Sequence, residues 1–171
     1  MFRSWYKRNP MDDQKNSLNK KIDFRFVLTR LMKYCAYQER STGEVRKQMA
    51  KYGLGPEEEE KLIRQLIEER FIDDLRFATS YASGKLRNNQ WGRNRIRLGL
   101  REKGVDEGKT EKALQIFEPC LYQEVMRGLI QKKDRQVRDE NEYVRRNKIA
   151  RFLIGKGFEP DLVWDMIREE I

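Results

Sequence analysis

Two adjacent aspartates, Asp73 and Asp74, are the residues of this sequence whose type and spacing could do chemistry. They stand in the stretch FIDDLRFATSYASGKLRNNQWG, residues 71–92, at the start of a segment rich in lysine and arginine. Carboxylates can bind Mg²⁺ and so support a carboxylate-dependent nuclease, provided that separate elements bring further acidic side chains to the same place. The alternative is structural, because an aspartate before a helix caps its free backbone amides.

Histidine is absent from all 171 residues, which restricts the chemistry further. It is the usual general base near neutral pH and a common metal ligand, so Ser-His-Asp, Cys-His and histidine-metal mechanisms are excluded. Cys35 and Cys120 are far apart and form no C-x-x-C pair, which argues against a disulfide framework or a zinc site. We therefore expect no metal, no cofactor and a cytoplasmic location.

The local sequence favours the structural role for both aspartates. With Asp73 as the N-cap, Asp74 falls in the first helical turn, and Ile72 and Phe77 take the positions of a hydrophobic staple. Residues 75–101 contain no further acidic side chain, and the charges there are positive. A metal site should gather several oxygen ligands rather than one doublet. The sequence therefore predicts no catalytic residues.

Helix signals run along nearly the whole chain, without convincing strand alternation. Ser41, followed three residues later by Glu44, predicts a capping box that opens a helix ending at Gly53. A further helix is expected from Pro56, with residues 57–60 all glutamate near its positive end. These signals predict an all-α protein.

An internal repeat of about 50 residues emerges when three glycines are aligned. Each glycine has apolar residues four and eight positions before it, and a second apolar stripe begins nine positions after it. The glycines are Gly53, Gly104 and Gly157, with Met49, Leu100 and Leu153 four positions earlier and Val45, Ile96 and Ile149 eight positions earlier. A preceding helix in each copy completes a three-helix unit.

These patterns predict an elongated tandem array of three three-helix repeats. The expected repeats are residues 21–72, 73–118 and 119–171, and residues 1–20 are expected to form a flexible N-terminal tail. A unit of about 50 residues buries limited core by itself, so neighbouring units should pack against each other in a curved array. No stretch approaches the ~20 apolar residues of a membrane span.

Positive charge is concentrated in the second and third predicted repeats. The whole chain carries a net charge of +9, whereas residues 81–103 and residues 127–156 each carry +6. The remainder of the chain is therefore net negative. Such a distribution favours a partner that presents phosphates or an acidic surface.

Three arginines are predicted to form a basic ridge on one helix. Arg93, Arg97 and Arg101 are spaced by four residues and share a face, which is either an ordinary solvated surface or a track for phosphates or an acidic protein groove. Because arginine suits bidentate recognition, the binding role is favoured. The predicted partner- or nucleic-acid-binding residues are Lys85, Arg87, Arg93, Arg97, Arg101, Arg145, Arg146, Lys148 and Arg151.

Trp91 lies within the first basic segment and has two candidate roles. Its ring could stack on a nucleic-acid base, or it could cover the junction of helices beneath Gly92. The junction role is favoured.

Three stretches of the sequence resemble the RecX family of bacterial recombination regulators. They are YCAYQERSTGEVRKQM, FIDDLRFATSYASGKLRNNQWG and RIRLGLREKGV. The family's D-D-x-x-F-A pattern is matched by Asp73, Asp74, Phe77 and Ala78, and its second-repeat helix by Ile96, Leu100, Lys103 and Gly104. The resemblance covers about residues 21–171.

The resemblance implies a tandem array of three-helix units that binds the RecA filament on DNA. Such proteins restrain the ATPase, strand-exchange and co-protease activities of the filament, and the family has no enzymatic residues. The implied partner is the RecA recombinase filament, with single- or double-stranded DNA as a further contact, and we expect the free chain to be monomeric. A general basic nucleic-acid-binding module is the alternative function, and the carboxylate-dependent nuclease is a third.

Overall fold

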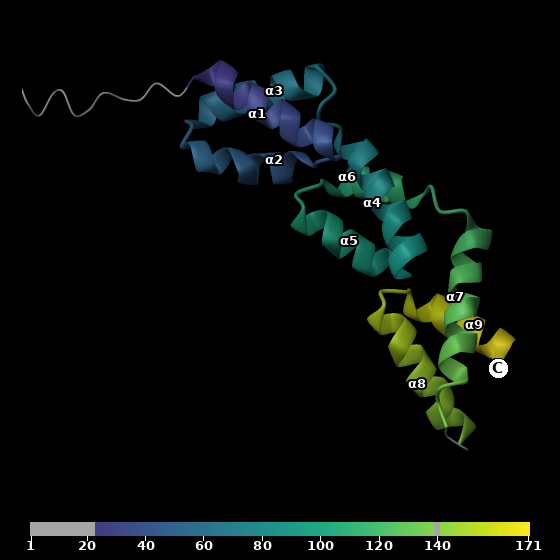
Figure 1. The fold of residues 1–171 in the computed structure, drawn as a ribbon. Coiled ribbons are helices and arrows are strands. Elements are labelled where there is room, and N and C mark those ends of the chain that lie inside the picture. Colours follow the sequence, from purple (N-terminus) through teal and green to yellow (C-terminus); the bar gives the residue numbers. More distant parts are fainter. Residues whose placement is uncertain (1–22, 139–140) are drawn as a thin grey trace, which may run out of the picture.

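The computed structural model describes residues 23–138 and 141–171, and in these ranges it contains helices and no strand (Figure 1). The all-α prediction is confirmed, while the predicted tail of residues 1–20 lies outside the described residues. Every described helix is too short or too polar to cross a membrane. The helices are α1 (Phe24–Tyr37), α2 (Thr42–Met49), the 3-10 helix η1 (Ala50–Tyr52), α3 (Pro56–Glu68), α4 (Asp74–Asn89), α5 (Arg93–Glu102), α6 (Glu107–Leu114), α7 (Pro119–Asp134), α8 (Glu142–Gly155) and α9 (Pro160–Glu170).

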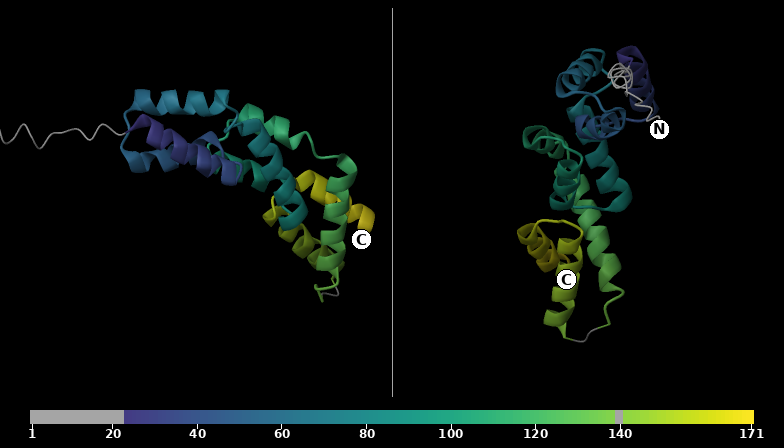
Figure 2. Two further views of the ribbon diagram at one scale, coloured as in Figure 1. Left: turned by 45° about the horizontal axis from the view of Figure 1, so that its top comes forward. Right: turned by 90° about the vertical axis from the view of Figure 1, so that its left-hand side faces the viewer.

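The helices form three successive units that follow one another along an elongated molecule (Figures 1 and 2). The first unit is α1–α3, the second α4–α6 and the third α7–α9. The predicted array of three three-helix repeats is therefore confirmed. The residue limits proposed above for the repeats stay a prediction.

The helix ends follow the local signals in the sequence. The backbone N–H of Glu44 donates to Ser41 Oγ at 3.1 Å, and the Glu44 carboxylate accepts from the Ser41 backbone N–H, which completes the capping box. The three aligned glycines, Gly53, Gly104 and Gly157, have φ angles of 62°, 74° and 91°. This left-handed conformation is available to glycine without strain, so each glycine ends its helix where the repeat predicts.

The apolar residues form two separate cores. One core belongs to the first unit, where Val27, Val45 and Leu62 from its three helices are fully buried. The other core runs without interruption through the second and third units, and its Tyr122 and Phe158 rings lie 5.3 Å apart. The second and third units therefore form one packed body, to which the first unit is joined.

The junction between the first and second units is polar. The Ser41 hydroxyl donates to the Lys103 carbonyl at 2.6 Å, and Lys103 Nζ contacts the Glu44 carboxylate at 2.6 Å. Gly43 lies so close that a Cβ added there would sit 2.3 Å from the Lys103 carbonyl oxygen. The start of α2 thus meets the C-terminal turn of α5 through backbone, hydroxyl and ionic contacts.

The junction between the second and third units joins the equivalent elements, but here backbone hydrogen bonds cross it. The Gly92 N–H donates to the Lys156 carbonyl at 2.9 Å, and the Asn94 N–H donates to the Gly157 carbonyl at 3.0 Å. A Cβ added at Gly92 would lie 2.2 Å from the Phe158 backbone nitrogen, so a larger residue would push the two units apart. Here the start of α5 meets the C-terminal turn of α8, and the shared core lies behind the contact.

Because the cores are separate, we expect a substitution that destabilises the second unit to destabilise the third unit as well, but not the first. Leu100 is fully buried in the shared core, so Leu100→Asp places an unpaired charge there and should destabilise that body by on the order of 4 kcal/mol. Hydrogen exchange should show lost protection in α4–α9 and retained protection in α1–α3.

Leu98→Asp is the matched control, because Leu98 lies on the same helix and its side chain is 45% exposed. It should leave both bodies folded. Retained protection of α4–α9 in Leu100→Asp would show that the shared core does not depend on this position.

Candidate functional site

Asp73 caps the helix that it precedes. Its Oδ1 accepts the backbone N–H groups of Leu75 at 2.9 Å and Arg76 at 3.0 Å. These are two of the amides that have no partner inside α4. The predicted N-cap role of Asp73 is confirmed.

Asp74 caps a different helix, which the sequence did not indicate. Its two oxygens accept the backbone N–H of Thr42 at 2.7 Å and the Thr42 hydroxyl at 2.9 Å, and Lys109 Nζ lies 3.4 Å away. Thr42 begins α2, so this side chain, which is only 9% exposed, holds the first unit against the second. Thr42 stands 32 residues before Asp74, and no local pattern connects the two.

The described residues contain no set of ligands for the metal ion that a carboxylate-dependent nuclease would need. In residues 23–138 and 141–171, no group of three histidine, cysteine, aspartate or glutamate side chains is placed to hold a metal ion. Asp73 and Asp74 accept from the starts of two different helices. The carboxylate pair is therefore explained by helix capping.

Arg93, the first residue of the predicted ridge, holds the second junction together. Its guanidinium contacts the Glu159 carboxylate at 3.0 Å and lies 4.1 Å from the centre of the Tyr122 ring. The Tyr122 hydroxyl accepts the Arg93 backbone N–H and donates to Glu159 at 2.7 Å. Burial, followed by the hydrogen bond to Glu159, raises the pKa of Tyr122, so the hydroxyl keeps its proton.

Arg97, the second ridge residue, forms an ion pair that recurs at equivalent positions in the first unit. Its guanidinium binds both oxygens of Glu111, at 2.6 and 3.2 Å, and this hydrogen bond lowers the pKa of Glu111. Arg46 and Glu60 form the corresponding pair in the first unit at 2.7 Å. In both units the arginine stands seven residues before the aligned glycine and the glutamate seven residues after it. The arginine–glutamate ion pair therefore links the second and third helices of each of these two units.

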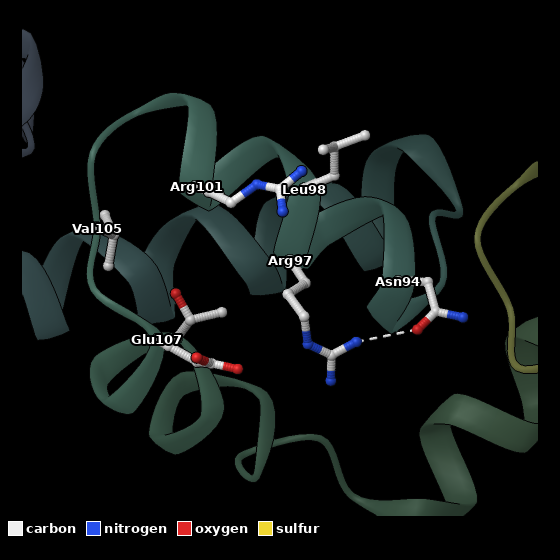
Figure 3. Close-up of a pocket in the computed structure, with 7 residues that line it drawn as sticks. Asn94, Arg97, Leu98, Arg101, Val105 and Glu107 are labelled. Carbon is white, nitrogen blue, oxygen red and sulfur yellow. Dashed lines mark hydrogen bonds between the residues drawn. The ribbon is translucent and has the colours of Figure 1, made fainter.

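Arg101 is the ridge residue that stays exposed, and it makes no ion pair with the described residues. Figure 3 shows it across a groove from Glu107, with Arg97 directed toward Asn94. The groove has a volume of about 440 Å³, and exposed Leu98 also lines it. The structure thus divides the predicted ridge into two arginines with acidic partners and one that faces solvent.

The predicted cations on α8 divide in a similar way. Arg145 and Arg146 have acidic partners, Asp134 at 3.4 Å and Glu142 at 2.5 Å. The exposed predicted cations of this helix are Lys148 and Arg151. On α4, Arg87 is exposed as well, whereas Lys85 is half-buried.

The second junction brings together five cations that come from distant parts of the sequence. They belong to α4, α5 and α7 and to the residue that caps the end of α8. We call this group the junction cluster: Lys85, Arg95, Lys132, Lys133 and Lys156. Within the described ranges, no ion pair links any of them to a carboxylate. Lys85 is the one member that the sequence analysis selected. The two basic segments did point to this region, but their convergence depends on the packing of α4 and α5 against α7 and α8.

Two aromatic rings contact four of the five cations of the junction cluster, which have no carboxylate partners among the described residues. The Trp91 ring centre lies 4.7 Å from Lys85 Nζ and 4.2 Å from Arg95 Cζ. The Phe152 ring centre lies 5.1 Å from Lys133 Nζ and 5.5 Å from Lys156 Nζ. Such contacts orient cations without neutralising them. Trp91 is half-buried against the shared core, as its predicted junction role requires.

Three members of the junction cluster, Lys132, Lys133 and Lys156, line a hollow of about 280 Å³ together with Phe152 and Gln90. Burial lowers the pKa of Lys156, and the positive charges of Arg95 and Lys132 lower it further. The cations of the cluster thus repel one another in the absence of an anion. An uncompensated positive field of this kind attracts polyanions.

The fold and this surface define a helical-repeat protein whose unneutralised cations gather where the second unit meets the third. Residues 73–114 match the family model described as "RecX, second three-helix domain", and residues 121–167 match "RecX, third three-helix domain". The chain belongs to the RecX family.

Known relatives agree with this assignment. Regulatory protein RecX of Limosilactobacillus reuteri (strain DSM 20016) is 30% identical over 143 residues, which are 84% of this chain and 54% of that protein. Regulatory protein RecX of Prosthecochloris aestuarii is 27% identical over 150 residues, which are 86% of this chain and 95% of that protein. The crystal structure of RecX from Lactobacillus salivarius matches with a TM-score of 0.82 at 26% identity and covers 86% of this chain and 96% of its own. The chain thus spans about half of the first relative and nearly all of the other two.

The two aspartates should have separable effects that do not involve a metal. Asp73→Ala removes an N-cap and should lower the free energy of unfolding by about 0.5–2 kcal/mol. Asp74→Ala should in addition speed amide exchange at the start of α2, because Thr42 loses its acceptor. Urea denaturation and hydrogen exchange measure the two effects. DNA cleavage in Mg²⁺ that stops after either substitution would contradict the capping role.

The arginines of the predicted ridge should also differ in how much they contribute to the free energy of unfolding. Arg93→Ala removes the ion pair to Glu159 and the contact with Tyr122, and should lower the free energy of unfolding by about 1–3 kcal/mol. Arg101→Ala is the control and should change it by less than about 0.5 kcal/mol, since the side chain is exposed. Equal urea midpoints for the two variants would show that Arg93 does not stabilise the junction.

Proposed function

We propose that this chain binds the RecA recombinase filament on DNA and modulates it, mainly by inhibiting its ATPase, strand-exchange and co-protease activities in DNA repair and recombination. Membership of the RecX family supports a regulatory role. The elongated array supports contact with an extended partner, because successive units present a long surface. On this proposal the protein acts in the cytoplasm, is monomeric when free and does no chemistry of its own.

The observation that carries the proposal is the group of unneutralised cations on the second and third units. The junction cluster supplies five of them, and the exposed arginines Arg87, Arg101 and Arg151 extend the positive surface. Arginine and lysine that have no acidic partner of their own are available to phosphates or to an acidic protein groove. Arg93, Arg97, Arg145 and Arg146 contribute charge to this surface while they serve the fold through their acidic partners.

A general basic nucleic-acid-binding module is the second candidate function. The cations held against Trp91 and Phe152 favour it, because grooves for single strands combine basic side chains with aromatic rings. The two functions differ in the preferred partner. A filament regulator should bind RecA-coated DNA more tightly than free DNA of the same length, and a general module should show no such preference.

The exposed arginines should be required for inhibition of RecA. Replacing Arg87, Arg101 and Arg151 together with alanine removes three positive charges without breaking an ion pair among the described residues. We expect ATP hydrolysis by RecA on single-stranded DNA to be inhibited by the wild-type protein and much less by this variant. The assay is run over a range of salt concentrations, since each lost phosphate contact should flatten the slope of log K against log salt by about 0.7 for a single strand.

Three exposed cations of the first unit provide the matched control: Arg25, Lys33 and Arg64. Their replacement with alanine changes the net charge equally, and inhibition should persist. Full inhibition by the second-and-third-unit variant, or equal loss in both variants, would contradict the proposed surface.

A further inference from the structure

The two junctions place opposite charges at the same position of the repeat. Glu44 stands nine residues before Gly53, and Arg95 stands nine residues before Gly104. The partner position is the residue directly before the next aligned glycine, which is Lys103 in the first junction and Lys156 in the second. A carboxylate therefore faces lysine in one junction, and a guanidinium faces lysine in the other.

The aligned glycines approach the start of the preceding middle helix at adjacent rather than identical positions of the repeat, since Gly104 faces Gly43 whereas Gly157 faces Arg95. In the first junction, a Cβ added at Gly43 would lie 2.3 Å from the Lys103 carbonyl oxygen. In the second junction, a Cβ added at Gly157 would lie 2.3 Å from the Cβ of Arg95. Arg95 is thus packed directly against the residue that follows Lys156.

The consequences for electrostatics are opposite in the two junctions. Lys103 Nζ lies 2.6 Å from Glu44 Oε1, and the two side chains are 32% and 17% exposed, so this ion pair is partly shielded from water. Lys156 Nζ instead donates to the Asn89 carbonyl at 3.4 Å, and burial, followed by the charges of Arg95 and Lys132, lowers its pKa. The second junction is supported by a core that spans both units and by the Arg93–Glu159 ion pair, and the position that Glu44 takes in the first junction carries a positive charge here.

We propose that a phosphodiester group of a nucleic-acid strand binds between Arg95 and Lys156 and supplies the negative charge that Glu44 supplies to Lys103 in the first junction. The strand would continue past Lys132 and Lys133 and lie beside the rings of Trp91 and Phe152. Binding there draws the second and third units together, because the two cations belong to different units. The inference extends the proposed function by assigning one of its contacts to the nucleic acid itself.

A phosphodiester chain fits this place better than an acidic polypeptide does. The cations belong to both units and none has a carboxylate partner among the described residues, so the place suits a partner with a charge on every repeat, as a phosphodiester strand has. The Trp91 and Phe152 rings hold cations on their faces and so keep them directed toward such a strand without neutralising them.

The substitution Arg95→Glu tests the inference, because it should act in opposite directions on two measurements. It gives Lys156 the same partner that Lys103 has, so the amides of Gly92 and Asn94, which donate across the second junction, should exchange more slowly than in the wild type. It also removes the anion site, so the affinity for a fluorescent oligothymidylate, measured by anisotropy without RecA, should fall by about ten- to a hundredfold. A residue with only a structural role would not give this combination.

Two further arms separate charge from packing. Arg95→Gln keeps much of the stem over Trp91, and should weaken oligothymidylate binding and reduce the salt slope by about 0.7 without slowing exchange to the level of Arg95→Glu. Arg25→Glu reverses an exposed charge on the first unit and should leave binding and exchange unchanged. In the wild type, saturating oligothymidylate should itself slow exchange of the Gly92 and Asn94 amides.

Three results would overturn the inference. These are unchanged oligothymidylate affinity in Arg95→Glu, faster exchange of the two amides in that variant, and binding of polyglutamate that equals oligothymidylate binding and depends equally on Arg95. The last result would assign the site to an acidic protein surface. Because RecA is absent from these assays, their failure is distinguishable from failure of the proposed function, which is judged by RecA ATP hydrolysis.

Discussion

The close approach of two backbones at each junction is the constraint on which the array depends. The start of one middle helix, α2 or α5, lies against the left-handed glycine turn that ends the middle helix of the next unit. Gly104 and Gly157 are needed for the turns, and Gly43 and Gly92 are needed because a Cβ would collide with the neighbouring unit. The same two elements thus meet at both junctions, although the individual atomic contacts differ.

A fixed backbone contact leaves the surrounding side chains free to differ between repeats. The first and second units link their second and third helices by Arg46–Glu60 and Arg97–Glu111, whereas the third unit has Ala150 and Trp164 at these positions. In the same way, a capping aspartate in the first junction is replaced in the second by a tyrosine hydroxyl, which accepts the first backbone amide of α5. The units therefore share their backbone geometry more closely than their side-chain interactions.

The sequence predicted what depends on neighbours along the chain and missed what depends on neighbours in space. The capping box at Ser41, the cap at Asp73 and the glycine turns need at most a few adjacent residues, and all are present as predicted. The hydrogen bond between Asp74 and Thr42 joins residues of different units. Likewise, helical spacing places Arg93, Arg97 and Arg101 on one face, but it cannot show that Glu159 and Glu111 approach that face from other helices.

We expect the two junctions to respond differently to salt, because each has an ion pair but an apolar core spans only the second. The first is held by ion pairs and hydrogen bonds through Glu44, Lys103 and Asp74, and screening by salt weakens the ionic part of such contacts, more so where they are exposed. The second is backed by a continuous apolar core, which salt at ordinary concentrations does not screen. Stiffness therefore varies along the molecule. A body of two units keeps the junction cluster in a fixed geometry, and the first unit is attached to it by contacts whose strength depends on the ionic surroundings. On the proposed function, such an array would present its cations from the body of two units, while its first unit could adjust to the shape of the same partner.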